Sequence, residues 1–443
     1  MSEITFIAGG ATAAQGFSAT GEHVGIRRNR TRRDVALIVS EVPANAACVY
    51  TQNLVKGAPI LVTQKHVENG IAQAVICNSG NANTCNANGV EIAEGMCALV
   101  EKYIGVKAED VIVASTGVIG QPMTLEPFEK NFGKLADSLE DTPAGGTRAA
   151  EAIMTTDTVS KEVAVRFPLG GKMCKLGGIS KGSGMIAPNM ATMLCFLTTD
   201  AAISPVALKR ALTTVTADTF NMLSIDGDTS TNDMVSILAN GMAGNTPIES
   251  CMGADYEAFV AALYKVCEKL CAIMAKDGEG ATKLLVCEVT GAKSTAAAKL
   301  VAKAVIKSTL LKAALGMIPT TGGEVYIDGD ELSTLTRREI AQRAAYMPQD
   351  HGVPSITVRR MALHGRFPYL SYPRRYAKTD YEAAERALER AGGDRRDRLG
   401  KQPRRTARQT FPTLGILLVL LRCNHGAAPS LVFELDFRSH VTR

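Results

Sequence analysis

The sequence is poor in histidine and has no CxxC cysteine pair, and both absences narrow the kinds of catalytic and metal-binding site that it supports. Only six of the 443 residues are histidine, and residues 1–302 hold two of them, His23 and His66. A Ser-His-Asp triad or a histidine-based zinc site in that part would need one of these two. Neither stands in a supporting motif, so we expect each to be a surface or hydrogen-bonded core histidine. The 11 cysteines include no CxxC pair, which favours reduced thiols in the cytosol.

Long hydrophobic runs are missing as well. The longest apolar run covers residues 414–421 and contains a glycine, whereas a helix needs about 20 apolar residues to cross a bilayer. We therefore expect neither a transmembrane segment nor a secretory leader. Cys267 and Cys271 share a helix face but have no further ligand nearby, so they are expected to fill a core.

Charge is distributed unevenly along the chain. Residues 1–302 carry 25 Lys and Arg against 30 Asp and Glu, whereas residues 303–443 carry 24 against 14. A basic segment can bind nucleic acid or an anionic membrane surface. This one has no interleaved aromatic residues and no nucleic-acid motif, so we expect neither partner. The change predicts a domain boundary near residue 303, in a chain long enough for two or three domains.

Short apolar runs that stop at Gly or Asn alternate with helical periodicity in the first 302 residues. Residues 74–77 and 111–114 are typical of strands, and apolar residues at helical spacing between them predict a helix that ends at Gly105. A second, longer helix is predicted over residues 259–276, with Gly278 as its terminator. This alternation indicates an α/β layered domain.

The segment KGSGMIAPNMATML at residues 181–194 is the strongest candidate for chemistry. A Gly-rich turn and a proline lead into an apolar strand that begins with Thr192. Spacing alone favours a buried strand threonine. The alternative is an N-terminal nucleophile, in which the Thr192 hydroxyl attacks the carbonyl of Ala191 and an N-to-O acyl shift precedes hydrolysis. The freed amino group of Thr192, with a pKa of about 8, then serves as the base and no histidine is needed.

This segment is one of four motifs that occur in order along the first 302 residues. They are SGNAN at 79–83, ASTGVIG at 114–120, MTTDT at 154–158 and the segment at 181–194 itself. Together they resemble the ornithine acetyltransferase family of arginine biosynthesis, also called bifunctional glutamate N-acetyltransferase. The resemblance covers about residues 3–302.

The resemblance implies a reaction and the residues that carry it. It implies self-cleavage between Ala191 and Thr192, followed by ping-pong transfer of acetyl from N-acetylornithine to glutamate through acetyl-Thr192. Acetyl-CoA is an alternative donor. Thr116 and Gly117 match the family's oxyanion hole. The substrate-binding positions match the nucleophile Thr192 and the residues Thr155, Lys181 and Glu279.

The same resemblance implies the architecture and the setting. It implies an α/β layered sandwich of mixed sheets flanked by helices, of the self-processing N-terminal-nucleophile type. It also implies a cytoplasmic heterotetramer of two α and two β chains, with no metal and no bound cofactor. The α chain would cover residues 1–191 and a truncated β chain residues 192–302.

The rest of the chain departs from that family. Strings at residues 307–312, 322–329 and 346–350 resemble the ATP-binding subunit of ABC transporters, especially iron-siderophore importers, over about residues 307–393, with Gln349 at the Q-loop position. Residues 324–329 predict a strand and turn, and Asp380 is expected to cap a helix ending near residue 392.

An active ATPase is not expected from this second part. A phosphate loop needs glycines because its backbone N–H groups curl around the phosphates, but Val301 and Ile306 occupy the two glycine positions. We expect an incomplete α/β fragment over residues 303–400 and an unassigned tail over 401–443, disordered or derived from a shifted reading frame. The competing interpretations are an inactive chimeric product, an ABC transporter component and a self-cleaving amidase or aminopeptidase.

Overall fold

The computed structural model describes most of the first 306 residues and short parts of the remainder. The described residues are 3–184, 193–224, 230–278, 284–287, 289, 292–306, 326–327, 330–331, 334, 336, 339, 376–390 and 416–418. They belong to two compact units, Met1–Glu279 and Gly280–Arg443. Ala191, Thr192, Glu279 and Gln349 lie outside the described residues. The predicted domain boundary near residue 303 stays a prediction.

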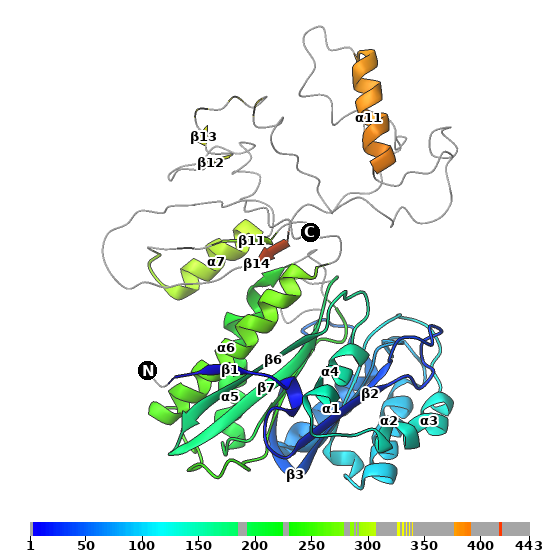
Figure 1. The fold of residues 1–443 in the computed structure, drawn as a ribbon, viewed down its shortest axis with the longest axis vertical. Helices are drawn as coiled ribbons and strands as arrows, with labels where there is room; N and C mark the ends of the chain where they lie inside the picture. Colours follow the sequence, from blue (N-terminus) through cyan, green and yellow to red (C-terminus); the bar gives the residue numbers. More distant parts are fainter. Residues whose placement is uncertain are drawn as a thin grey trace. The chain divides into compact units, whose positions relative to one another are not determined.

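Strands and helices are interspersed along the first unit (Figure 1), and the predicted order of strand, helix and strand holds for β4, α2 and β5. The strands are β1 (Thr5–Ile7), β2 (Phe17–Glu22), β3 (Val35–Tyr50), β4 (Ile71–Asn78), β5 (Val111–Ser115), β6 (Lys161–Leu169), β7 (Lys172–Lys181), β8 (Leu194–Thr199), β9 (Leu223–Ser224) and β10 (Met234–Ala239). The α-helices are α1 (Ala58–His66), α2 (Gly89–Ile104), α3 (Glu126–Asp137), α4 (Pro143–Ala152), α5 (Pro205–Asp218) and α6 (Ala254–Lys276).

The strands predicted at 74–77 and 111–114 and both predicted helices of this unit are confirmed, and the strand expected from Thr192 is described as β8, which begins at Leu194. The predicted strands are β4 and β5, which pair in parallel, and the helix between them is α2. Gly105 ends α2 with a φ of 84°, a left-handed conformation that glycine adopts at little cost. The long predicted helix is α6, whose C-cap is Asp277, one residue before the expected terminator Gly278.

Nine strands form one mixed sheet. Their order is β1-β6-β7-β8-β10-β3-β4-β5, and β2 pairs with β3 beside this path. The β8–β10 and β4–β5 pairs are parallel, and the other pairs are antiparallel. The 16-residue strand β3 belongs to both halves, because its start pairs with β4 and β2 whereas its end pairs with β10. Its pairing with β4 is irregular between Val39 and Ala44, where the register shifts.

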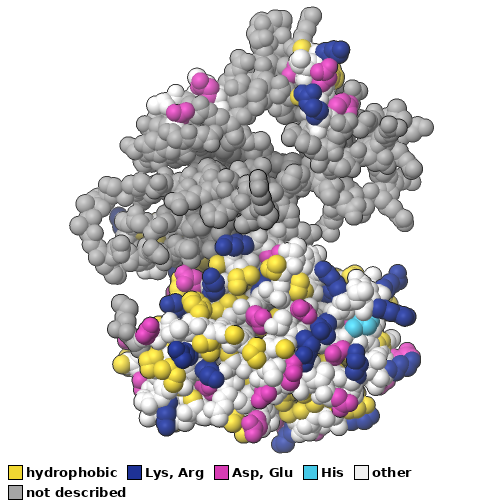
Figure 2. Space-filling model, viewed as in Figure 1, with side chains coloured by type: hydrophobic (Ala, Val, Ile, Leu, Met, Phe, Trp, Pro, Cys, Tyr) yellow, Lys and Arg dark blue, Asp and Glu magenta, His cyan; other side chains and the backbone are white. Residues whose placement is uncertain are grey.

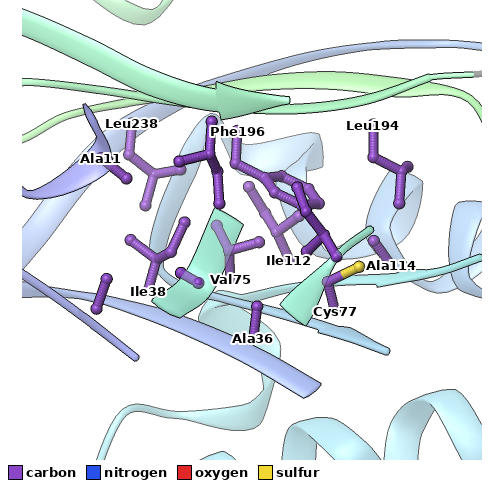
Figure 3. Packing of buried hydrophobic residues seen from close by; sticks show 14 of the residues in the cluster. Ala11, Ala36, Ile38, Val75, Cys77, Ile112, Ala114, Leu194, Phe196 and Leu238 are labelled. Carbon is purple, nitrogen blue, oxygen red and sulfur yellow. The ribbon is translucent and has the colours of Figure 1, made fainter. Parts of the chain in front are cut away.

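The two halves of the sheet face each other across a shared core. Phe196 of β8 and Leu238 of β10 belong to the same buried cluster as Ile38 of β3, Val75 of β4 and Ile112 of β5. Figure 3 shows these side chains entering the core from opposite ribbons. The two halves of this one sheet therefore form the two layers of a sandwich. The predicted fold class, an α/β layered sandwich of mixed sheets flanked by helices, is confirmed.

Helices cover the outer faces of this sandwich. Alternate residues of β4 point to opposite sides: Val75 joins the shared core, whereas Ala74 and Ile76 join a second cluster with Met96 of α2 and Phe128 of α3. Helix α6 packs against β6 and β7 on the other half (Figure 1). Both faces of the central strands are buried, which explains why their sequences are almost continuously apolar.

The second unit contains fewer described elements. They are β11 (Leu284–Val286), α7 (Thr295–Ile306), β12 (Tyr326–Ile327), β13 (Asp330–Glu331), α11 (Lys378–Arg390) and β14 (Ile416–Leu418). Strand β11 pairs in parallel with β14, and β12 pairs with β13 in antiparallel fashion. Val301 and Ile306 lie within α7, so the two positions where a phosphate loop needs glycine are helical.

One expectation for this unit agrees with the described residues and one needs correction. The strand and turn expected over residues 324–329 include the described strand β12, which pairs with β13, and residues 324, 325, 328 and 329 lie outside the described residues. Helix α11 begins at Lys378, two residues before the expected cap Asp380. Asp380 lies in the first turn, and its carboxylate accepts the N–H of Ala377 at 2.9 Å. The carboxylate thus caps the helix from inside, which the sequence alone did not distinguish from an N-cap position.

The described surface is mixed in character. Figure 2 shows basic, acidic and hydrophobic side chains interspersed over the first unit, in keeping with its nearly balanced charge. Among the helices that the structure describes, none has both the length and the apolar character required to cross a bilayer.

Candidate active site

The site begins where the parallel strands β4 and β5 end side by side. The carboxyl ends of parallel strands meet at one edge of a sheet, and the loops that follow them share that edge. The Asn78 side chain donates to the Ser115 hydroxyl at 2.7 Å, and the Asn78 carbonyl accepts the Thr116 N–H at 2.9 Å. Farther along, the Ala82 N–H donates to the Val118 carbonyl at 2.9 Å. These contacts bring the motifs at 79–83 and 114–120 together.

Gly117 sits where these two loops approach most closely. Its φ of 126° lies in the region that favours glycine. A Cβ added there would lie 2.6 Å from the carbonyl carbon of Gly80 and 2.8 Å from the nitrogen of Asn81. Both backbone conformation and space therefore require glycine at this position. The neighbouring Thr116 is half-buried.

Lys181 reaches this loop from the other half of the sheet. It is the last residue of β7 and is 5% exposed, and its Nζ lies 3.3 Å from the Thr116 hydroxyl oxygen. An ammonium group can only donate, so the hydroxyl accepts here and its own proton remains available to another acceptor. Burial lowers the pKa of Lys181 below 10.5, although the carboxylates of Asp157 and Asp233 oppose the shift.

Asp157 joins Lys181 to the Thr155 loop. One oxygen of its buried carboxylate accepts the N–H of Thr155 at 2.8 Å, and the other accepts the N–H of Gly182 at 2.8 Å. Burial alone would raise the pKa of this carboxyl, but Lys181, Lys161 and the hydrogen bonds lower it to about 2. Asp157 is therefore ionised at neutral pH.

The residue that follows the predicted nucleophile is also held by a carboxylate. The Met193 N–H donates to Asp233 Oδ1 at 2.8 Å, and the Met193 carbonyl accepts the N–H of Met234 at 3.1 Å. Leu194, the next residue, lies opposite Lys181 in the β7–β8 register. The described chain on both sides of residues 185–192 thus converges on Lys181.

Four of the predicted catalytic and substrate-binding residues lie among the described residues, and the structure brings them together. Thr116 and Gly117 are adjacent on one loop, Lys181 contacts Thr116, and Thr155 shares the Asp157 carboxylate with the end of β7. The two early histidines lie elsewhere. His66 contacts the Val111 carbonyl at 2.9 Å, and His23 contacts Asp34 at 3.1 Å, as expected for satisfied side chains.

Sequence reasoning missed three buried charged residues beside this site, namely Asp157, Lys161 and Asp277. The sequence did contain a signal that Lys161 is buried. In β6 it shares the inward-facing, period-two positions of Val163 and Val165, so a strand pattern places a charge on a buried face. Buried charges need partners. The partners themselves could not be read from the sequence, because Asp277 is 116 residues away.

The remaining cysteine expectation is confirmed. Cys267 and Cys271 are buried in α6, and burial raises the pKa of both thiols. Within the described ranges, no group of three or more His, Cys, Asp or Glu side chains could hold a metal ion.

Comparisons with known proteins identify relatives over the first part of the chain. The ArgJ family model matches residues 18–319, which extends past residue 302. The arginine biosynthesis bifunctional protein ArgJ of Symbiobacterium thermophilum is 49% identical over 312 residues, which are 70% of this chain and 77% of the relative. The protein of the same name from Shouchella clausii is 48% identical over 311 residues, or 70% and 74%. A crystal structure of the Bacillus halodurans protein is 40% identical and covers 43% of this chain and 98% of that chain, with a TM-score of 0.41.

Proposed function

Because this chain belongs to the ArgJ family, we propose that it is a self-cleaving acetyltransferase of arginine biosynthesis that moves acetyl from N-acetylornithine to glutamate. The observation that carries the proposal is the 3.3 Å contact between Lys181 Nζ and the Thr116 hydroxyl. It joins two family motifs 65 residues apart, next to the strand that begins just after Thr192. The other two motifs adjoin it, because the Ala82 N–H donates to the Val118 carbonyl and the Asp157 carboxylate accepts the Gly182 N–H.

The first reaction is cleavage of the chain. The Thr192 hydroxyl adds to the carbonyl carbon of Ala191, the peptide C–N bond breaks, and the α-amino group of Thr192 takes up the proton. Water then hydrolyses the ester, which leaves Ala191 with a carboxylate and Thr192 with a free amine. The α chain would be residues 1–191, and the β chain would begin at residue 192.

The second reaction is transfer of the acetyl group. The amine of Thr192 accepts the proton of its own hydroxyl as the oxygen attacks the acetyl carbonyl of N-acetylornithine, and ornithine leaves with that proton. The amino group of glutamate then attacks acetyl-Thr192 and restores the hydroxyl. Each tetrahedral intermediate carries an oxyanion, for which the Thr116 hydroxyl and Gly117 N–H are the proposed donors. No resident cofactor takes part, and acetyl-CoA is an alternative first donor.

Three side chains are proposed to bind the substrates. Lys181 presents a buried ammonium for a substrate carboxylate, Thr155 lies on the adjoining loop, and Glu279 supplies a carboxylate for the cationic end of ornithine. We propose a cytoplasmic heterotetramer of two α and two β chains, and mass photometry of the purified protein tests this assembly. A species of one α and one β chain would contradict it.

Intact mass spectrometry combined with an exchange assay tests the function. The purified protein is expected to contain fragments of residues 1–191 and 192–443, and to transfer deuterated acetyl from N-acetylornithine to glutamate. The acyl-enzyme is expected as a mass increase of one acetyl group on the β chain alone. An uncut chain that accepts no acetyl group from either donor would refute the proposal.

The pH dependence of substrate binding tests the role of Lys181. The ammonium form binds a carboxylate, and its pKa lies below 10.5, so affinity for glutamate should fall as the pH rises through that lowered value. Lys181→Met should raise the KM for glutamate about 10- to 100-fold near neutral pH, the size of one charge-assisted hydrogen bond. The measurement is KM against pH for both proteins. The amino group of glutamate titrates in the measurements on both proteins. The difference between the two KM–pH profiles therefore reports the titration of Lys181 alone.

Lys172→Met is the matched control for this experiment. Lys172 lies at the opposite end of β7 and is exposed, so its loss should leave KM unchanged. Parallel pH profiles for wild type and Lys181→Met would contradict the assignment.

The second part of the chain has a separate proposed origin. We infer that residues 307–393 derive from an ABC transporter ATP-binding subunit, on the strings at 307–312, 322–329 and 346–350. Because Val301 and Ile306 replace the glycines of the phosphate loop, ATP binding is not expected. Equilibrium titration with labelled ATP tests this, and saturable binding would contradict it.

A further inference from the structure

Three charged side chains form a buried network beside the proposed site. Lys161 Nζ lies 2.6 Å from Asp157 Oδ1 and 2.6 Å from Asp277 Oδ2. The side chains of Lys161 and Asp157 are fully buried, and that of Asp277 is 4% exposed. Removing ions from water is unfavourable unless each finds partners in good geometry. The two short contacts of Lys161 satisfy this condition, and they join β6, the loop before it and the C-terminus of α6.

The carboxylate oxygens of Asp157 and Asp277 also accept hydrogen bonds from main-chain N–H groups of the site. Asp157 accepts N–H groups from Thr155 and Gly182, both at 2.8 Å. Asp277 accepts the Thr158 N–H at 3.0 Å and also the Thr158 hydroxyl. The network therefore holds both ends of the Thr155–Thr158 turn and the first residue after β7.

A further contact closes the network at the end of α6. The Ser183 hydroxyl donates to the main-chain carbonyl of Asp277 at 2.7 Å. The residues after β7 are thus tied to both carboxylate-bearing segments, through Gly182 to Asp157 and through Ser183 to Asp277.

We propose that Asp157, Lys161 and Asp277 form a positioning network for the acetyl-transfer site, holding the Thr155–Thr158 turn and the end of β7 in one arrangement; the inference rests on the function proposed above. Both segments carry a proposed binding residue. Thr155 precedes Asp157 by two residues, and Lys181 directly precedes Gly182. None of the three charged residues needs to touch substrate for this role.

The network also contributes to the electrostatic environment of the Lys181 ammonium group. Lys181 faces Asp157, Asp233, Cys77 and Lys161, of which the two carboxylates favour its charged form. Asp157 therefore interacts electrostatically with two ammonium groups, those of Lys161 and Lys181, and Lys161 also lies 2.6 Å from Asp277.

Two variants test the network in the full-length chain. Asp277→Asn keeps the size of the side chain and leaves the Lys161–Asp157 pair intact, whereas Lys161→Met removes the central charge. Both should speed amide hydrogen exchange across residues 155–159 at least about tenfold, because the protecting acceptors are weakened. They should raise KM for N-acetylornithine about 10- to 100-fold, as displacement of binding groups does, while kcat changes less than about threefold.

Asp200→Asn is the matched control. Asp200 is a buried carboxylate that accepts the N–H groups of Gln15 and Lys175. It follows β8 at its far end, about 20 Å from Leu194 by strand length. Its substitution should change exchange near its own partners and lower the melting temperature, without changing KM. A merely structural network would behave like this control.

The outcomes separate this inference from the proposed function. If Asp277→Asn keeps the wild-type KM for N-acetylornithine, the network has no positioning role, whatever happens to hydrogen exchange over residues 155–159 and whether or not Lys161→Met folds. If the wild-type chain transfers no acetyl group, the proposed function fails. In that case equilibrium binding of N-acetylornithine, measured by calorimetry, replaces KM: weaker binding by Asp277→Asn than by the wild type supports the network, and equal binding overturns it.

Discussion

Replacing Thr192 by alanine is expected to leave the chain as one uncut 443-residue species without acetyl transfer. Alanine has no hydroxyl, so neither the N-to-O acyl shift nor the acetyl-enzyme can form. Removal of the nucleophile from a covalent acyl-transfer enzyme costs about 10⁴-fold or more in rate. Intact mass spectrometry measures the cleavage, and the exchange of labelled acetyl between N-acetylornithine and glutamate measures the transfer.

Two further substitutions make that experiment specific. Thr192→Ser keeps a hydroxyl and should retain cleavage, at a changed rate. Thr213→Ala removes an exposed hydroxyl on α5 that, among the described residues, donates to the Lys209 carbonyl of its own helix, and this variant should cleave like the wild type. Fragments of residues 1–191 and 192–443 in purified Thr192→Ala would rule out this nucleophile.

Replacing Gly117 by alanine should lower kcat by about 10²- to 10³-fold, the usual cost of losing one oxyanion donor. The added methyl group would lie 2.6 Å from the Gly80 carbonyl carbon, closer than any real Cβ contact. The φ of 126° is itself strained for alanine, by about 1–3 kcal/mol. The two loops must separate, which moves the Gly117 N–H and the Thr116 hydroxyl away from the oxyanion. Single-turnover rates and melting temperatures measure the two effects.

Gly120 supplies a control on the same loop. Its φ is 73°, but a Cβ added there would meet nothing within 4 Å. Gly120→Ala therefore introduces backbone strain of about 1 kcal/mol without a clash, and kcat should change less than about tenfold. Equal losses in the two variants would mean that backbone strain, and not the approach of Gly117 to Gly80, limits the activity.

The first unit was largely predictable because its signals are local. The apolar runs at 74–77 and 111–114 and the helical spacing between them identified β4, α2 and β5. Strand pleating and helix periodicity follow from residues close in sequence.

The start of helix α11 in the second unit was predicted less accurately. Asp380 was expected to precede the helix as its N-cap, but it lies in the first turn and accepts the Ala377 N–H from there. Caps of both kinds use the same residue types, and sequence alone does not separate them.

The candidate site was predictable only as a set of motifs. The strings at 79–83, 114–120, 154–158 and 181–194 carry the resemblance, but nothing in them gives the contact of Lys181 with Thr116. That contact depends on where β7 ends relative to the loop after β5. The pairing of these strands passes through β8, β10, β3 and β4 in the sheet order.

The sequence by itself determined the class of the domain, its principal strands and helices, the family resemblance and the residue types available for chemistry. The tertiary structure alone decided that β3 serves both halves of the sheet, and that Lys161 joins two aspartates separated by 120 residues. The physical reason is the range of the forces involved. Backbone propensity and side-chain periodicity act over a few neighbouring residues, whereas a buried ion pair exists only after distant segments have folded together and excluded water.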